Sequence, residues 1–171
     1  MPRAFVGLGS NVGDRLGFLQ AAVSELEQTG GITVSRASSV YETEPVGKKD
    51  QPDFLNMALE LECELDVTAL HSKCKEIERQ LGRSRTERWG PREIDIDLLY
   101  YGDAIISRDR LTVPHPEIIS RRFVLIPLAE LAGTFIDPVR QRSMAGLLES
   151  CPDTSRVTKT AFSAHSHSLG V

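Results

Sequence analysis

Two aspartates stand one residue apart in an apolar run near the middle of this 171-residue chain. Ile94, Ile96 and Leu98 alternate with Asp95 and Asp97, and this period of two is typical of a half-buried β-strand. Alternate residues of a strand point to the same face, so both carboxylates would project side by side. Oxygen ligands in this arrangement suit Mg²⁺, which usually takes one or two protein carboxylates and completes its shell with water and phosphate oxygens.

Arginines are concentrated immediately before the aspartates. The stretch 83–92 reads RSRTERWGPR and contains four arginines against one glutamate, and Arg121 adds a further cation later in the chain. A guanidinium group forms bidentate hydrogen bonds with phosphate oxygens. Metal-binding carboxylates together with several arginines favour phosphoryl-type transfer, because catalysis there consists mostly of positioning and charge neutralisation. Trp89, inside the same stretch, offers a flat ring for stacking on a substrate ring.

The aspartate pair alone leaves other functions open. An Asp-x-Asp pair on a strand can be an ordinary solvated face, and it also holds one metal ion in nucleotide-sugar transferases. Such transferases need a larger doubly wound nucleotide domain, for which 171 residues leave little room. A non-catalytic binding module, for example for RNA, is disfavoured by the net charge of −4, the pI of about 5.6 and the absence of an aromatic RNP-like strand. We therefore expect no nucleic-acid partner.

The elements that must position these residues follow one another in a regular order. Hydrophobic periodicity predicts strands at 3–8, 32–42, 54–64 and 93–101, and helices at 14–29 and 66–81. It also predicts short strands near 105–106 and 111–113, and helices at 121–131 and 143–150. The order β-α-β-β-α-β indicates an α+β fold with a ferredoxin-like core, in which helices pack on one side of an antiparallel sheet, followed by a C-terminal helical region. In the strand 54–64, Asn56, Ala58 and the glutamates are expected on a solvated face.

The remaining segments suggest how the chain is organised. The glycines of GSNVGD at 9–14 are expected to supply tight turns. The polar loop 44–52 is longer than the usual connection, and its composition fits a functional lid and an inert surface loop equally well. We expect one catalytic domain over residues 1–150 and a flexible tail over 151–171, which is rich in Ser, Thr and His. Three widely spaced cysteines fit reduced thiols, and no membrane span or signal peptide is visible. These features predict a cytoplasmic protein, and we expect a monomer.

Several blocks of the sequence resemble one enzyme family, in the family's own order. These blocks, within residues 5–131, are GLGSN, YETEPVG, DQPDFLN, LGRSRTERWGPR, RWGPREIDIDLL, LTVPHPE and RRFVLIPLAE. In them the chain resembles the 6-hydroxymethyl-7,8-dihydropterin pyrophosphokinases (HPPK) of folate biosynthesis. The resemblance implies transfer of an intact pyrophosphoryl group from ATP to the hydroxymethyl oxygen of the dihydropterin, which leaves AMP.

The resemblance also implies roles for individual residues. Asp95 and Asp97 would bind two Mg²⁺ ions, with ATP as co-substrate. Arg83 and Arg92 would act with them in catalysis; the loop before Trp89 is one residue shorter than in some members, which leaves the choice between Arg83 and Arg85 open. The ATP contacts would be Lys75, Arg83, Arg85, Trp89, Arg92, Leu98, Arg110, Thr112, His115 and Arg121. The pterin contacts would be Thr43, Pro45, Val46, Phe54, Asn56, Trp89 and Phe123.

Overall fold

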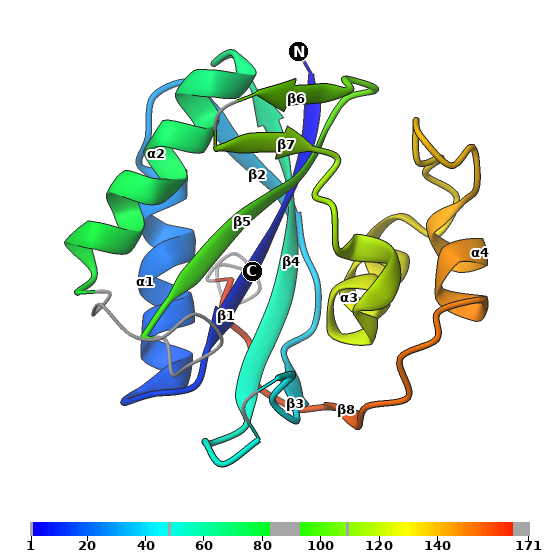
Figure 1. Cartoon of the computed structure of the whole chain (residues 1–171). Coiled ribbons are helices and arrows are strands. Elements are labelled where there is room, and N and C mark those ends of the chain that lie inside the picture. Colours follow the sequence, from blue (N-terminus) through cyan, green and yellow to red (C-terminus); the bar gives the residue numbers. More distant parts are fainter. Residues whose placement is uncertain (1, 48, 83–92, 109, 166–171) are drawn as a thin grey trace.

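An antiparallel sheet with helices on both faces forms the centre of the protein (Figure 1), in a computed structural model that describes residues 2–47, 49–82, 93–108 and 110–165. The strands of the six-stranded sheet are β1 (Arg3–Ser10), β2 (Ile32–Ala37), β3 (Tyr41–Thr43), β4 (Phe54–Cys63), β5 (Asp95–Tyr101) and β8 (Val157–Lys159). A separate hairpin consists of β6 (Ile106–Arg108) and β7 (Leu111–Val113). The helices are α1 (Arg15–Glu27), α2 (Val67–Gln80), α3 (Arg122–Ala132) and α4 (Met144–Glu149), with a 3-10 turn, η1 (Ile118–Ser120), before α3.

The strand order brings distant parts of the sequence into one row. The order is β5-β1-β4-β3-β8, and β2 also pairs with β4. Gly9 of β1 lies opposite Asp95 of β5 on one side and opposite Asn56 of β4 on the other. Gly7 lies opposite Asp97 in the same way. Only Gly9 therefore separates Asp95 from Asn56 across the sheet, and Asp97 lies in the adjacent row of the same face.

Each face of the sheet has its own apolar layer. One layer joins Ile94, Ile96 and Leu98 to the buried faces of α1 and α2. The other joins Leu99 and Tyr100 to α3 and α4. A register shift in the pairing of β1 with β5 lets these two consecutive residues share one face, as a bulge does. The two helices of the expected core, α1 and α2, lie on one side of the sheet, and the C-terminal helices α3 and α4 cover the second face.

The starts of three helices follow from capping side chains. Asp14, Asp66 and Ser143 precede α1, α2 and α4, and each side chain accepts a hydrogen bond from a backbone N–H in the first turn. The apolar stripe of α2 includes Cys74, which is completely buried. Burial raises the pKa of this thiol to about 12, so it remains protonated and packs as a small apolar side chain. None of the helices in the described part of the chain has the length and apolarity that a membrane span requires.

Two predictions about the strands need correction. The predicted strand 32–42 is divided into β2 and β3 at Ser38. The Ser38 hydroxyl accepts the N–H of Ala58 and donates to the carbonyl of Ser39, and these side-chain hydrogen bonds interrupt the regular backbone ladder. The predicted solvated face of β4 is covered at its beginning. Asn56 and Ala58 are buried there, the latter in the layer with α3, and the glutamates further along remain near the surface.

The expected flexible tail is also wrong for residues 151–165. β8 pairs with β3, so the end of the chain extends the sheet. Beyond it, Ala164 is buried in the layer with α1, and the His165 ring lies 2.9 Å from the carboxylate of Glu27. This packing needs a partner strand that is over a hundred residues away in sequence, which composition does not reveal. Residues 166–171 lie outside the described residues.

Asp137 is a buried carboxylate that organises the segment between α3 and α4. It accepts hydrogen bonds from the Tyr100 hydroxyl (2.6 Å) and from the backbone N–H groups of Val139 and Arg140, and the Arg140 guanidinium lies 3.3 Å away. Burial raises the pKa of Asp137, but these hydrogen bonds outweigh it and leave the pKa below its usual value.

We expect Asp137→Asn to lower the free energy of unfolding by about 2–3 kcal/mol at pH 7, because hydrogen bonds to a buried charge are lost. Because the pKa of Asp137 is lower in the folded protein than in the unfolded chain, ionised Asp137 stabilises the fold. This stabilisation is present above the pKa of the unfolded chain, about 3.9, and is lost as the pH falls through the pKa of the folded protein. Urea titrations at pH 7 and below pH 4 measure this, and the difference between variant and wild type should shrink at the lower pH. A deficit that is independent of pH would contradict the ionised role of Asp137.

Candidate active site

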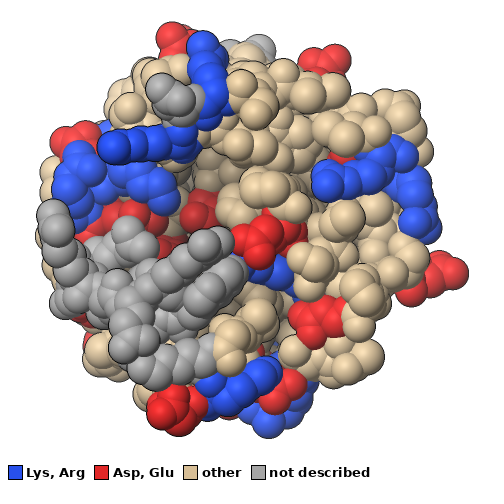
Figure 2. Space-filling view, in the orientation of Figure 1, with Lys and Arg blue, Asp and Glu red and all other residues tan. Residues whose placement is uncertain are grey.

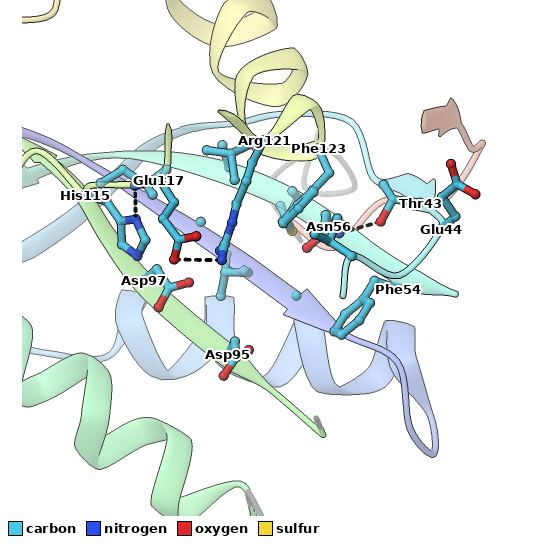
Figure 3. Close-up of a pocket in the computed structure, with 18 of the residues that line it drawn as sticks. Thr43, Glu44, Phe54, Asn56, Asp95, Asp97, His115, Glu117, Arg121 and Phe123 are labelled. Atoms are coloured by element: carbon cyan, nitrogen blue, oxygen red, sulfur yellow. Dashed lines mark hydrogen bonds and ion pairs between the residues drawn. The ribbon is translucent and has the colours of Figure 1, made fainter. Parts of the chain in front are cut away.

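Asp95 and Asp97 face one cavity of about 280 Å³ that opens beside β5. Figure 3 shows both carboxylates on the same face of β5, with His115, Glu117 and Arg121 on one side of the cavity and Asn56, Phe54 and Phe123 at its other end. The Asp97 side chain keeps 40% of its surface exposed. Two acidic side chains are thus accessible from one opening, as the alternating pattern predicted.

The outer edge of β5 is held by α2. The buried Glu78 carboxylate accepts the backbone N–H of Ile96 at 2.6 Å, and the Lys75 ammonium donates to the Ile96 carbonyl at 3.3 Å. Lys75 and Glu78 also form an ion pair at 3.2 Å. Side chains of a helix therefore supply the partners that an edge strand would otherwise lack, at the residue between the two aspartates.

Lys75 supplies positive charge next to the aspartates. Its ammonium lies 3.8 Å from the Asp97 carboxylate. Burial lowers the pKa of Lys75, but the carboxylates of Glu78 and Asp97 outweigh it and hold the pKa above its usual value. Lys75 is therefore a fixed cation at neutral pH, suited to a phosphate group near the carboxylates.

His115, Glu117 and Arg121 form the wall opposite Lys75. The backbone N–H of Glu117 donates to Nδ1 of His115, which places the proton of the neutral ring on Nε2. Burial lowers the pKa of His115, and the nearby Arg121 guanidinium adds to this effect against the opposing Asp97. The Arg121 guanidinium pairs with the Glu117 carboxylate at 2.9 Å. The wall thus offers a neutral imidazole and a guanidinium to anionic groups of a ligand.

The other end of the cavity combines an amide with two aromatic rings. The Asn56 amide, 7% exposed, donates to the Thr43 hydroxyl at 2.8 Å, which orients it toward the cavity. Phe54 and Phe123 line the cavity on either side of Asn56 (Figure 3). Rings and an oriented amide bind a flat heterocycle by stacking and by paired hydrogen bonds.

Gly7 and Gly9 form the floor between the two ends. Both line the cavity, and a Cβ on Gly9 would lie 2.5 Å from Oδ1 of Asn56. Gly9 was expected in a turn, and this is wrong because it lies within β1; the turn glycine is Gly13, which has a positive φ of 73°. Gly7 and Gly9 are two residues apart, so they lie on the same face of a strand. This spacing is the sequence signal that could have identified them as the floor of the cavity.

A second cavity, of about 450 Å³, shares Lys75 with the first. Most of its lining residues are basic or polar and come from α2 and the β6–β7 hairpin. Besides Lys75, the lining consists of Thr68, His71, Ser72, Arg79, Arg108, Arg110 and Leu111. Figure 2 shows Lys and Arg side chains gathered over these elements, beside a hollow in which acidic atoms are visible. A ligand that carries a polyphosphate could extend from one cavity to the other past Lys75.

Most of the described residues that the sequence suggested line one of these cavities. The first cavity is lined by Thr43, Val46, Phe54, Asn56, Lys75, Asp95, Asp97, His115, Arg121 and Phe123, and Arg110 lines the second. Three residues line neither: Leu98 is buried in the layer with α1 and α2, Pro45 is buried, and Thr112 is exposed on β7. Arg83, Arg85, Trp89 and Arg92 lie outside the described residues. Sequence reasoning missed Glu44 and Glu117 and, apart from Lys75 and Arg110, the lining of the second cavity.

The family of this chain follows from its sequence. The family model described as 7,8-dihydro-6-hydroxymethylpterin-pyrophosphokinase (HPPK) matches residues 5–133. The chain belongs to the HPPK family. Among curated HPPK relatives, the 2-amino-4-hydroxy-6-hydroxymethyldihydropteridine pyrophosphokinase of Bacillus subtilis is 48% identical over 128 residues, which cover 75% of this chain and 77% of the relative. The enzyme of the same name from Methylorubrum extorquens is 49% identical over 136 residues, covering 80% of this chain and 86% of the relative.

Solved structures support the same HPPK fold. A crystal structure of an HPPK-DHPS in complex with substrates superposes with a TM-score of 0.70 at 12% identity, covering 87% of this chain and 43% of that chain. An HPPK-DHPS structure from Plasmodium falciparum gives a TM-score of 0.68 at 13% identity, covering 86% and 45%. The present chain therefore spans less than half of these longer proteins. At such low identity the likeness concerns the fold alone.

Proposed function

We propose that this protein transfers the pyrophosphoryl group of ATP to the hydroxymethyl oxygen of 6-hydroxymethyl-7,8-dihydropterin and releases AMP. The single observation that carries this proposal is the row across the sheet in which only Gly9 separates Asp95, one of the aspartate pair, from the oriented amide of Asn56. The metal-binding end and the heterocycle-binding end are thus one strand apart. Membership of the HPPK family agrees with this reaction and with its place in folate biosynthesis.

Asp95 and Asp97 fit Mg²⁺ as ligands. They are carboxylates on one face of a strand, and the described residues contain no group of three or more His, Cys, Asp or Glu side chains arranged to hold a metal. Two carboxylates with few other protein ligands are typical of Mg²⁺ sites that are completed by water and substrate phosphates. When bound there, Mg²⁺ would supply Lewis-acid stabilisation of phosphate oxygens and would make the pterin hydroxyl more acidic. We propose two ions, which the charge of ATP and the exposure of both carboxylates favour.

The side chains of the first cavity bind and orient the pterin in this proposal. The Asn56 amide can both donate to and accept from the amide edge of the pterin, and its bond with Thr43 keeps it from rotating. Phe54 and Phe123 stack on the ring. The glycine floor lets the ring lie flat against β1, so that the hydroxymethyl group points toward the aspartates.

The basic residues between and around the cavities bind ATP. Lys75 and Arg121 neutralise phosphate charge, and His115 can donate from Nε2 to a phosphate oxygen. Arg121 must exchange its partner Glu117 for a phosphate when ATP binds. We assign the nucleoside to the second cavity, with Arg110, and the arginines of 83–92 to the phosphates. These contacts hold the reacting groups in line, which is the main requirement of this type of transfer.

The proposal also covers the topology of the fold, the cellular compartment, the oligomeric state and the extent of the domain. With β2 and β3 counted as the two halves of the predicted second strand, the element order is β-α-β-β-α-β. This order and the strand order β5-β1-β4, with β2 and β3 beyond β4, favour a ferredoxin-like core with α3 and α4 added on the second face. Three free cysteines favour a reducing compartment such as the cytoplasm. We propose a monomeric catalytic domain that extends beyond residue 150, since β8 completes the sheet.

The products of the reaction test the function. We expect the purified protein with Mg²⁺, ATP and 6-hydroxymethyl-7,8-dihydropterin to form AMP and a pterin diphosphate in equal amounts, as followed by ³¹P NMR. Omission of the pterin or chelation of Mg²⁺ should stop AMP formation. Formation of ADP, or of AMP at the same rate without the pterin, would contradict the proposal.

A further inference from the structure

The C-terminal segment 153–159 lies against the pterin end of the first cavity. This segment follows α4 and lies beyond the residues that the family model matches. In Figure 1 it runs from α4 past α3 and continues as β8 along β3. It contacts β3, the residue before β4 and the start of α3, and these three elements carry residues of the pterin end: Thr43 on β3, Phe54 and Asn56 on β4, and Phe123 on α3.

The first contact is the pairing of β8 with β3. β3 has only three residues, and Thr43 lies opposite Val157 in the antiparallel register. The pairing continues beyond the strands, since the backbone N–H of Glu44 donates to the carbonyl of Arg156 at 3.2 Å. β3 is therefore fixed between β4 and β8. Thr43, which accepts the Asn56 amide, depends on this position.

The second contact is made by Arg156. Its guanidinium pairs with the Asp53 carboxylate at 2.5 Å, immediately before Phe54, and its backbone N–H donates to the Glu44 carboxylate at 2.8 Å. Arg156 thus joins the two ends of the loop that connects β3 to β4. That loop includes Val46, and Glu44 itself lines the cavity.

The third contact fixes the start of α3. The Asp153 carboxylate accepts the backbone N–H of Arg122 at 3.0 Å, and the Arg122 guanidinium donates to the carbonyl of Ser155 at 2.8 Å. Phe123 is the next residue. Burial raises the pKa of Asp153, but bonds from Ser155 and Arg122 outweigh it and leave the pKa below its usual value, so this contact is ionic at neutral pH.

We propose that the segment 153–159 is a brace for the pterin end of the site and that Arg156 is a positioning residue for the pterin. The inference rests on the proposed function and adds to it a determinant of pterin affinity that lies outside residues 5–133, which the family model matches. The Arg156 contacts are with Asp53 and Glu44 and involve none of the residues assigned to the metal or to ATP. Replacement of the Arg156 side chain should therefore act on pterin binding and leave the metal and ATP sites unaffected.

Steady-state kinetics of Arg156→Gln test the brace. We expect the KM for the hydroxymethyl-dihydropterin to rise about threefold to fivefold, because an ion pair as exposed as this one contributes at most about 1 kcal/mol. The kcat and the KM for ATP should stay within error of wild type, and Arg156→Lys should restore most of the pterin affinity. Asp53→Asn should raise the same KM, and the double variant should be no worse than Arg156→Gln alone.

A second variant acts on the backbone pairing. Thr158 lies opposite Glu42, and Thr158→Pro should disturb the pairing of β8 with β3, since proline lacks an N–H donor. We expect a larger rise in the pterin KM, of tenfold or more. Arg142→Gln is the matched control, because the described hydrogen bonds of the Arg142 guanidinium are within the α4 region, to Ser150 and Gly146, and its replacement should leave all constants unchanged.

The outcomes separate the inference from the function on which it rests. If wild type forms pterin-dependent AMP but Arg156→Gln and Asp53→Asn keep the wild-type pterin KM, the brace is refuted and the function stands. A parallel rise in the KM for ATP, or a fall in kcat at unchanged KM, also refutes it. If Thr158→Pro fails to fold by circular dichroism, the two exposed side-chain variants decide. If wild type forms no pterin-dependent AMP, the proposed function itself fails.

Discussion

Asp97→Ala is expected to reduce turnover by a factor of about 10³ or more while the protein remains folded. A carboxylate that holds a metal ion contributes several kcal/mol of transition-state stabilisation, and each 1.36 kcal/mol corresponds to a factor of ten in rate. The fold should tolerate the change, because the Asp97 side chain is 40% exposed and its described ion pair with Lys75 is long, at 3.8 Å. Initial rates of AMP formation over a range of Mg²⁺ concentrations measure the effect.

The matched control is Asp103→Ala. Asp103 is an exposed acid in the turn that follows β5, so the variant changes the net charge equally without touching the cavity. We expect wild-type rates from it and an unchanged Mg²⁺ dependence. Asp97→Ala should also need more Mg²⁺ for half-maximal rate. If it kept more than a tenth of the wild-type rate with the same Mg²⁺ dependence, Asp97 would not be a metal ligand.

Local sequence patterns were sufficient for most of the helices and strands and for the acidic centre of the site. Asp95 and Asp97 alternate with Ile94, Ile96 and Leu98, and a period of two permits only one arrangement of their side chains on a strand. The caps Asp14 and Asp66 mark helix starts because the bonds that they form span only three residues. These features depend on near neighbours, so the sequence displays them directly.

The features that sequence reasoning missed depend on partners distant in the chain. Glu78 binds the edge of β5, which only the packing of α2 places there. β8 pairs with β3 although their residues are more than a hundred positions apart. Leu98 was assigned to ATP, yet its side chain lies in the layer opposite the aspartates, as its alternation with them requires. The family resemblance identified individual residues, but it did not place side chains relative to the sheet.

The second large effect is expected at Gly9, which lies in the GLGSN block but was expected only to supply a turn. Gly9→Ala would place a Cβ 2.5 Å from Oδ1 of Asn56, a separation that real Cβ contacts do not show, so the amide must move. The movement would break the 2.8 Å bond from the Asn56 amide to Thr43 and misalign the group that faces the pterin. Loss of one or two such hydrogen bonds costs about 1–3 kcal/mol, so we expect the pterin KM to rise about 10- to 100-fold.

Gly30→Ala is the matched control for Gly9→Ala. A Cβ on Gly30 would meet no atom within 4 Å, so this variant should keep wild-type kinetics. The KM for ATP should be unchanged in both variants, because the atoms nearest to the Gly9 Cβ belong to Asn56 and Phe54 at the pterin end. One methyl group on the floor of the cavity is therefore expected to raise the KM for the pterin and to leave the KM for ATP unchanged. An equal rise in both KM values would mean that Gly9→Ala shifts β1 as a whole, and a wild-type pterin KM would mean that Asn56 does not contact the pterin.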